Sequence, residues 1–282
     1  MRSNLLKKHA KSFYWASFFL SRKTFDKCSS LYNFCRTLDD IVDSDSKLEI
    51  KKENFLRFKK NFMNKDLNNQ IINEMWLIIN SEKISEKIVI DLFDGIETDL
   101  KEKVKINSKK ELLIYSYRVA GTVGLMMSKI LKVKDREALK GAVDLGIAMQ
   151  LTNIARDVCE DKNRNRQYIK SDFSAIKETI NDSQIFYQKS FNSISSIPFR
   201  SRFSVVLARR VYKKIGDYIL KQKNIENYNK AGKIYVPIFG KIIQTFFSIF
   251  DFIKLLFVKQ IIYDNHINHS IVEKEVNLNE RI

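Results

Sequence analysis

Apolar residues recur at intervals of three and four positions along almost the whole chain, and polar residues fill the positions between them. This is the period of an α-helix that buries one face. Only eight glycines and two prolines interrupt the 282 residues, and no repeat or flexible linker marks a domain boundary. The sequence therefore predicts a nearly all-α protein, folded as one large domain or two small ones.

The pattern also predicts where the helices lie and how some of them begin. Ser108 is a candidate N-cap, and Glu111 three positions later completes a capping box. The small residues of segment 119–127 allow either a close approach between helices or a helix break. Helices are expected over residues 4–20, 24–43, 53–65, 68–80, 84–100, 108–117, 135–161, 183–196 and 201–222.

The last part of the chain combines a strongly apolar segment with a polar end. Residues 240–263 are rich in Ile, Phe and Leu, but Asp251, Lys254 and Lys259 interrupt them, which argues against a membrane span. A buried terminal helix is the favoured interpretation, and a helix lying on a membrane surface is the alternative. Residues 265–282 are expected to form a flexible tail.

The net charge of +17 raises the question of an anionic partner. The basic residues are spread along the chain, and no helix-turn-helix, RRM or zinc pattern appears, so no nucleic-acid partner is expected. A solvated basic surface is the simplest interpretation, with attraction to anionic membranes as a secondary role. Cys28, Cys35 and Cys159 lack CxxC spacing, which indicates a reducing compartment. We therefore expect a cytoplasmic protein with peripheral contact at the inner face of the membrane.

Two acidic clusters carry the candidate chemistry. Each has carboxylates at positions i and i+4, which a helix places on the same face. Arg36 lies shortly before the first cluster and Arg156 directly before the second. Carboxylate oxygens suit magnesium, and arginine matches two oxygens of a diphosphate. The members are Asp39, Asp40 and Asp43 in the first cluster, and Asp157, Glu160 and Asp161 in the second.

The surroundings of both clusters favour a site over an ordinary solvated helix face. Gln150, Asn153, Asp157 and Asp161 form one polar stripe along the predicted helix 135–161, which fits a seam that lines an internal cavity. The first cluster is embedded in apolar residues, where unpaired carboxylates are costly and need cations.

Other chemistries find little support in the sequence. His266 and His269 have i, i+3 spacing but no cysteine or carboxylate partner at ligand spacing, so they are expected to be surface residues of the tail. No Ser-His-Asp arrangement and no GxGxxG loop is present, so hydride transfer from a Rossmann-bound cofactor is not indicated.

With these residues in place, the chain resembles the squalene and phytoene synthase family, from Lys11 to about Lys241. Within that family it is most similar to bacterial phytoene synthases. It departs from the family pattern at Ala10, where relatives often carry a hydroxyl residue, and at Lys230 and Lys233, where an arginine pair is usual. The motifs that carry the resemblance are Tyr32 to Asp43, Tyr117 to Gly124, Gln150 to Asp161, Arg166 to Ile169, Ile197 to Ser201 and Arg210 to Gly216.

The resemblance implies a single isoprenoid-synthase bundle over residues 1–264 with a central active-site cavity. It implies condensation of two geranylgeranyl diphosphates to phytoene, with magnesium as the cofactor and manganese as a substitute. The implied metal ligands are Asp39, Asp40, Asp43, Asn153, Asp157 and Asp161. The implied contacts to diphosphate or isoprenoid are His9, Lys11, Ser12, Tyr32, Arg36, Gln150, Arg156 and Tyr212. The implied catalytic residues are Asp39, Asp43, Asp157, Asp161, Arg36, Arg156, Tyr32 and Tyr117.

Two alternatives remain at this stage. A squalene or dehydrosqualene synthase would use farnesyl diphosphate, and the depth of the cavity decides between the two substrates. A non-catalytic family member that acts as an assembly partner is a more distant alternative, and both intact acidic motifs argue against it. The sequence does not indicate an oligomeric state.

Overall fold

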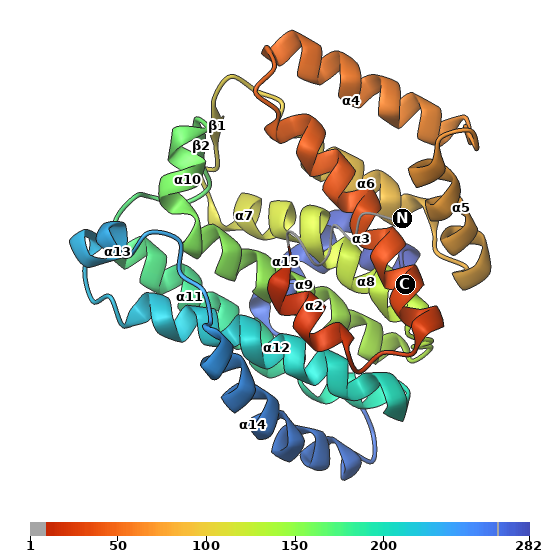
Figure 1. Ribbon diagram of the computed structural model, residues 1–282, viewed down its shortest axis with the longest axis vertical. Coiled ribbons are helices and arrows are strands. Elements are labelled where there is room, and N and C mark those ends of the chain that lie inside the picture. The colour runs from red at the N-terminus through yellow and green to blue at the C-terminus, as the bar shows by residue number, and fades with distance from the viewer. Residues whose placement is uncertain (1–9, 264) are drawn as a thin grey trace.

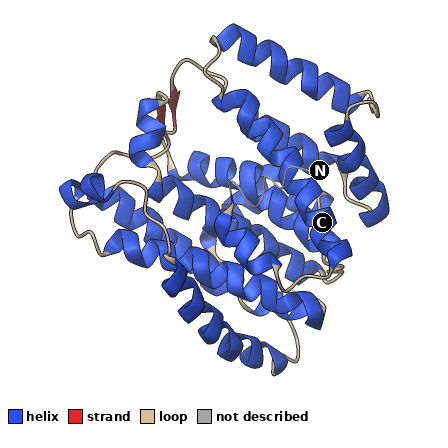
Figure 2. Ribbon diagram, viewed as in Figure 1, coloured by secondary structure: helices blue, strands red, loops and turns tan. Residues whose placement is uncertain are grey.

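Helix α9 (Arg136–Arg156) lies in the middle of the fold, and the other helices are arranged around it (Figure 1). Its residues Val143, Ile147 and Leu151 are fully buried, because three helices pack around it: α8 (Thr122–Ile130), α11 (Phe173–Lys189) and α12 (Phe199–Leu220). The computed structural model describes residues 10–263 and 265–282, and most of this part is helix, with loops and two short strands between the helices (Figure 2). The expected all-α bundle is confirmed.

The first third of the chain builds one side of the bundle from amphipathic helices. Phe34 on α3 packs with Phe62 and Phe93, at ring-centroid distances of 5.4 and 5.9 Å. These rings join α3 to α4 and α6, so α3 can present its other face to the interior. The helices are α2 (Lys11–Ser17), α3 (Arg22–Asp43), α4 (Leu48–Met63), α5 (Gln70–Glu82) and α6 (Glu86–Glu97).

The middle of the chain begins with the predicted cap. Ser108 accepts a hydrogen bond from the Glu111 amide and starts α7 (Lys109–Ser116). The Glu111 carboxylate accepts from the amide of Asn107 rather than from that of Ser108, so the box closes one residue earlier than expected. A π-helix, η1 (Tyr117–Gly121), then leads into α8 (Thr122–Ile130).

The small residues around η1 allow two backbones to touch, as expected. A Cβ atom at Gly124 would lie 2.3 Å from the carbonyl oxygen of Ala142 on α9. A Cβ atom at Gly146 would lie 2.3 Å from the carbonyl oxygen of Ala120. No side chain fits at either place, so η1 and α8 lie directly against the α9 main chain.

The predicted single helix over residues 135–161 is wrong in one detail. Helix α9 ends at Arg156, and Asp157 leaves helical geometry with φ −106° and ψ 15° before α10 (Val158–Asn163) begins. The Asp157 amide still donates to the Asn153 carbonyl at 2.9 Å, so the break in the helix is confined to the residue between α9 and α10. After α10, β2 (Arg166–Gln167) pairs in parallel with β1 (Val104–Lys105).

Helix α14 (Ile238–Leu256) is packed with its apolar side outward, which makes the favoured expectation of a buried terminal helix wrong. Its buried positions include Gln244, Ser248 and Asp251, and Asp251 pairs with Arg210 of α12. The elements that precede it are α11 (Phe173–Lys189), the 3₁₀ helix η2 (Asn192–Ser196), α12 (Phe199–Leu220) and α13 (Ile225–Ala231).

The C-terminal segment is folded, although a flexible tail was expected. Residues Ile267–Val276 form α15, which packs on α7, and Leu278–Glu280 form the 3₁₀ helix η3. His269 is fully buried instead of lying on the surface, and its Nδ1 is hydrogen-bonded to Asp144 at 2.7 Å. His266 contacts the same carboxylate at 3.1 Å. Their carboxylate partner, Asp144, lies on α9, so it is too far away in the sequence for local spacing to indicate it.

Candidate active site

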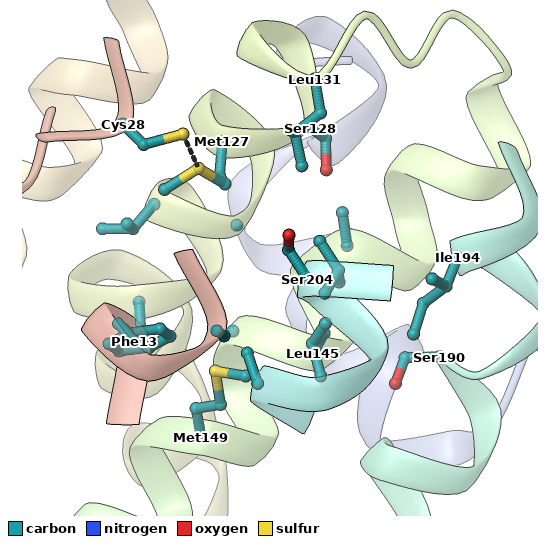
Figure 3. Close-up of a pocket in the computed structure, with 18 of the residues that line it drawn as sticks. Phe13, Cys28, Met127, Ser128, Leu131, Leu145, Met149, Ser190, Ile194 and Ser204 are labelled. Atoms are coloured by element: carbon teal, nitrogen blue, oxygen red, sulfur yellow. Dashed lines mark hydrogen bonds between the residues drawn. The ribbon is translucent and has the colours of Figure 1, made fainter. Parts of the chain in front are cut away.

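A cavity of about 300 Å³ lies between α2, α3, α8, α9, η2 and α12. Most of its lining is apolar or small, and Figure 3 shows Phe13, Met127 and Leu145 around the same space. Tyr32 and Gln150 also line it, together with Asn153 and Tyr212. The expected central cavity is therefore present, with a few polar groups in an otherwise apolar wall.

The two acidic clusters follow the cavity wall along their helices. Cys35 of α3 and Asn153 of α9 line the cavity, and Asp39 and Asp157 stand four residues further on. Four residues correspond to about one helical turn. Each cluster therefore begins one turn beyond the polar part of the lining.

Arg164 joins the two clusters directly. Its guanidinium contacts the Asp43 carboxylate at 2.6 Å and the Glu160 carboxylate at 3.3 Å. Arg166 also contacts Asp43, at 2.8 Å. Because Asp43 comes from α3 and Glu160 from α10, the fold brings the two motifs together as the sequence predicted. Asp40 takes no part in this bridge: it pairs with Arg36 at 2.6 Å and its side chain is 51% exposed.

Burial and mutual repulsion destabilise the ionised carboxylates of this cluster, so a nearby cation would stabilise them. Burial, helped by the nearby Asp43 carboxylate, raises the pKa of Asp39 to about 7. Burial and then Asp157 raise the pKa of Asp161 to about 7. Each of these carboxyls is thus poised to give up a proton when a cation approaches.

Asp99 is a further acid in this cluster, and the sequence motifs did not indicate it. Its carboxylate accepts hydrogen bonds from the hydroxyls of Tyr115 at 2.8 Å and Tyr168 at 2.7 Å. Burial raises the pKa of Asp99, although the nearby Arg166 opposes that change. No local spacing could have found it, because Asp99 lies in the short connection between α6 and β1, away from both motifs.

Arg156 is held against its neighbour in the chain. Its Nε and Nη2 atoms donate to the two carboxylate oxygens of Asp157 at 2.8 and 2.6 Å. Burial acts to lower the pKa of Arg156, but this bidentate pair outweighs it and raises the pKa. Lys233 lies 3.5 Å from Asp157 and 2.6 Å from Glu160, so the lysine that departs from the family pattern also lies at the site.

Aromatic rings form part of the cavity wall. Phe13 and Tyr212 have ring centroids 4.8 Å apart, and both line the cavity with Tyr32. Burial raises the pKa of Tyr32 to about 12, and burial also raises the pKa of Tyr212, so both hydroxyls stay neutral. Their ring faces can stabilise a positive charge that develops in the cavity.

Several predicted site residues lie elsewhere. Tyr117 is fully buried and does not line the cavity, and its hydroxyl donates to Asp91 at 2.8 Å. The π-helix that starts at Tyr117 changes the side-chain register, which the sequence pattern does not reveal. Lys11 is exposed and Ser12 half-buried at the start of α2. His9 lies outside the described residues.

The donor set suits a hard cation such as magnesium. In the described ranges, no three carboxylate, histidine or cysteine side chains stand together as a ready-made metal cage. Magnesium does not require one, since it binds through one or two carboxylates and keeps waters and substrate phosphates as ligands. The Asn153 Oδ1 atom is buried without a hydrogen-bond partner, and burial and repulsion raise the pKa values of Asp39 and Asp161. The oxygens present therefore fit the ion.

Comparison with known proteins agrees with this geometry. The squalene/phytoene synthase family profile matches residues 6–173. The chain is 26% identical to the 15-cis-phytoene synthase of Pantoea ananas, over 73% of this chain and 77% of that protein. It is 28% identical to the 15-cis-phytoene synthase of Enterobacter agglomerans, over 73% and 81%.

Solved structures show the same fold. A dehydrosqualene synthase in complex with a ligand superposes with a TM-score of 0.70 at 24% identity, covering 86% of this chain and 92% of that one. The profile match includes both acidic motifs and extends over more than half of the chain. The two acidic motifs, the arginine that bridges them, the apolar cavity beside them and the shared fold all lead to one assignment: this chain belongs to the squalene/phytoene synthase family.

Proposed function

We propose that this protein is a phytoene synthase. It joins two geranylgeranyl diphosphates head to head through a cyclopropyl diphosphate, and each substrate loses its diphosphate in turn. The observation that carries the proposal is the pair of acidic motifs, bridged by Arg164 and placed at the edge of an apolar cavity of about 300 Å³. The similarity to proteins named phytoene synthase supports the C20 substrate.

The residues present explain how ionisation becomes possible. Magnesium, held by Asp39, Asp43, Asn153, Asp157 and Asp161, would supply positive charge against the departing diphosphate. Arg156 and Lys233 both lie against the Asp157 carboxylate, and their cationic groups can bind diphosphate oxygens. The apolar lining keeps water away from the allylic cation, which water would otherwise trap. The reaction ends when a proton is lost from the rearranged C40 cation, so no reductant is needed.

Substrate length and the final step can be tested together. We expect geranylgeranyl diphosphate and magnesium alone to yield a C40 hydrocarbon with a conjugated triene, detected by its absorbance and mass. A chelator added to the same mixture is the matched control and should stop product formation. A preference for farnesyl diphosphate would instead identify the C30 reaction, and a product formed only with NADPH would identify squalene-type reduction.

Arg156→Lys should be a harmful change although it keeps the charge. Lysine loses the planar fork that now contacts both oxygens of Asp157 and that fits two diphosphate oxygens. We expect kcat/KM for the prenyl diphosphate to fall by roughly tenfold or more, the loss of about one charge-assisted hydrogen bond. Steady-state kinetics at saturating magnesium measure this. Unchanged kinetics would mean that Arg156 only neutralises Asp157.

We further propose peripheral contact with anionic membranes through α14. Its outward face is apolar, and Phe239, Phe246 and Phe257 are 73%, 59% and 76% exposed. Lys254 and Lys259 are exposed next to it and can contact anionic headgroups. Among the described residues no helix has the length and apolar character needed to cross a bilayer. A hydrocarbon product is poorly soluble in water, so a membrane contact near the cavity would let it pass directly into lipid.

A further inference from the structure

Asp91 is a buried acid of α6 that lies outside both metal-binding motifs. Its carboxylate accepts a hydrogen bond from the Tyr117 hydroxyl at 2.8 Å. Arg281, near the C-terminus, donates to both carboxylate oxygens, with its Nε at 3.0 Å and its Nη2 at 3.1 Å. Such a bidentate pair fixes direction as well as charge. Arg281 therefore reaches the first residue of the π-helix η1 through one shared partner.

The π-helix is part of the cavity wall. Tyr117 begins it, and two of its following residues, Val119 and Ala120, line the cavity. Tyr117 itself is fully buried on the other side, where Asp91 holds its hydroxyl. Tyr117 thus links the Asp91 contact to the part of η1 that lines the cavity.

The contacts around η1 leave it little room to adjust. A Cβ atom at Gly95 of α6 would lie 2.6 Å from the Cβ atom of Arg118, and one at Gly146 of α9 would lie 2.3 Å from the carbonyl oxygen of Ala120. Helix α6 and helix α9 therefore both pack closely against η1. A change in the distance between these helices would be transmitted to η1 because packed elements move as units.

Tyr263 and the C-terminal segment 265–282 contact both of these helices. At one end Tyr263, His266 and His269 surround Asp144 of α9, which is fully buried. At the other end Arg281 reaches Asp91 of α6. The segment therefore connects the two helices that pack against η1.

From these contacts we propose that Arg281 is a positioning residue for the prenyl chain: through Asp91 and Tyr117 it holds η1, and with it Val119 and Ala120, at the cavity wall. This inference rests on the proposed function, since it assigns the wall to the prenyl substrate. Arg281 contacts no reacting atom. It acts on how well the apolar chain of the substrate fits, not on the cluster of carboxylates.

Arg281→Gln tests the proposal because glutamine keeps much of the side-chain length but loses the charge and the fork. We expect KM for the prenyl diphosphate to rise by roughly tenfold, within the range of substitutions that act through packed elements, while kcat changes little. Arg281→Lys should recover part of the loss. Lys110→Ala is the matched control, since Lys110 pairs with Glu275 in the same segment but both side chains are exposed, by 58% and 44%.

Kinetics should be measured well below the melting temperature of each variant, so that a merely structural role would leave them unchanged. A lowered melting temperature with wild-type KM in Arg281→Gln would overturn the proposal. So would an equal rise in KM in Lys110→Ala.

Hydrogen exchange separates this inference from the proposed function. Amides of residues 117–121 should exchange faster in Arg281→Gln than in the wild type or in Lys110→Ala, with no substrate present. Equal exchange in all three proteins would reject the proposed role of Arg281 in holding η1, even if the enzyme makes phytoene. If the wild type turned over no prenyl diphosphate, the proposed function would fail, and faster exchange in Arg281→Gln would still support the coupling from Arg281 to η1.

Discussion

Replacing Asp39 with alanine is expected to lower turnover by at least about 100-fold, the usual cost of removing a main electrostatic stabiliser. Asp39 lies one turn beyond the cavity lining, and burial raises its pKa to about 7, so its charge is held for a cation and not for fold stability. Removing a carboxyl that is costly to bury should leave the helical fold intact. Turnover of a labelled prenyl diphosphate and far-UV circular dichroism measure the two effects.

Asp157→Ala should behave in the same way, since Asp157 directly follows the last residue of α9, one turn beyond the cavity-lining Asn153. Asp94→Ala is a suitable control, because Asp94 is a carboxylate of α6 that is 41% exposed and pairs with Lys59. It should keep wild-type activity. Near-normal turnover of Asp39→Ala at saturating magnesium would remove Asp39 from the metal site.

The second large effect concerns lipid. A variant with Phe246→Ser, Phe250→Ser and Phe257→Ser should lose at least about 100-fold in its partition onto anionic liposomes. Each phenyl group contributes roughly 1.5 kcal/mol or more when it leaves water, and every 1.4 kcal/mol is about tenfold. Flotation with anionic liposomes at low salt measures the partition, and wild-type binding should weaken at high salt.

A matched control removes apolar groups from another surface. Leu56, Leu67 and Leu77 of the α4–α5 region are 55%, 56% and 62% exposed, and their replacement by serine should leave flotation unchanged. Two results would contradict the membrane proposal. The wild type could remain wholly in solution at low salt, or it could resist both high salt and alkaline extraction as a spanning protein does.

The predictions that succeeded depend on local pattern. The three-and-four spacing of apolar residues indicates helices because one helix face must be buried, and the Ser108 cap needs only its neighbour Glu111. The two acidic motifs could be paired in advance because carboxylates at i and i+4 on two helices are useful only if they meet. The bridge from Arg164 to Asp43 and Glu160 confirms that they do.

The predictions that failed depend on tertiary contacts that no spacing encodes. Periodicity shows that α14 is amphipathic, but not that Asp251 would face inward to pair with Arg210 and leave the phenylalanines outside. The composition of the polar end of the chain suggests flexibility, but His269 contacts Asp144 and Arg281 contacts Asp91, and these tertiary contacts hold the segment in place. Tyr117 follows the helical register of a family motif, and a π-helix turns it away from the cavity.

The contact between η1 and α9 has a consequence for how this cavity can diverge. Where Gly124 and Gly146 meet the carbonyl oxygens of Ala142 and Ala120, the wall consists of main chain, which a single substitution cannot trim or thicken without pushing helices apart. The remaining walls, on α2, α3, α12 and η2, consist of replaceable side chains. Substitutions that fit the cavity to longer or shorter ligands should therefore occur in those four elements, while the two backbone contacts at the glycines stay unchanged.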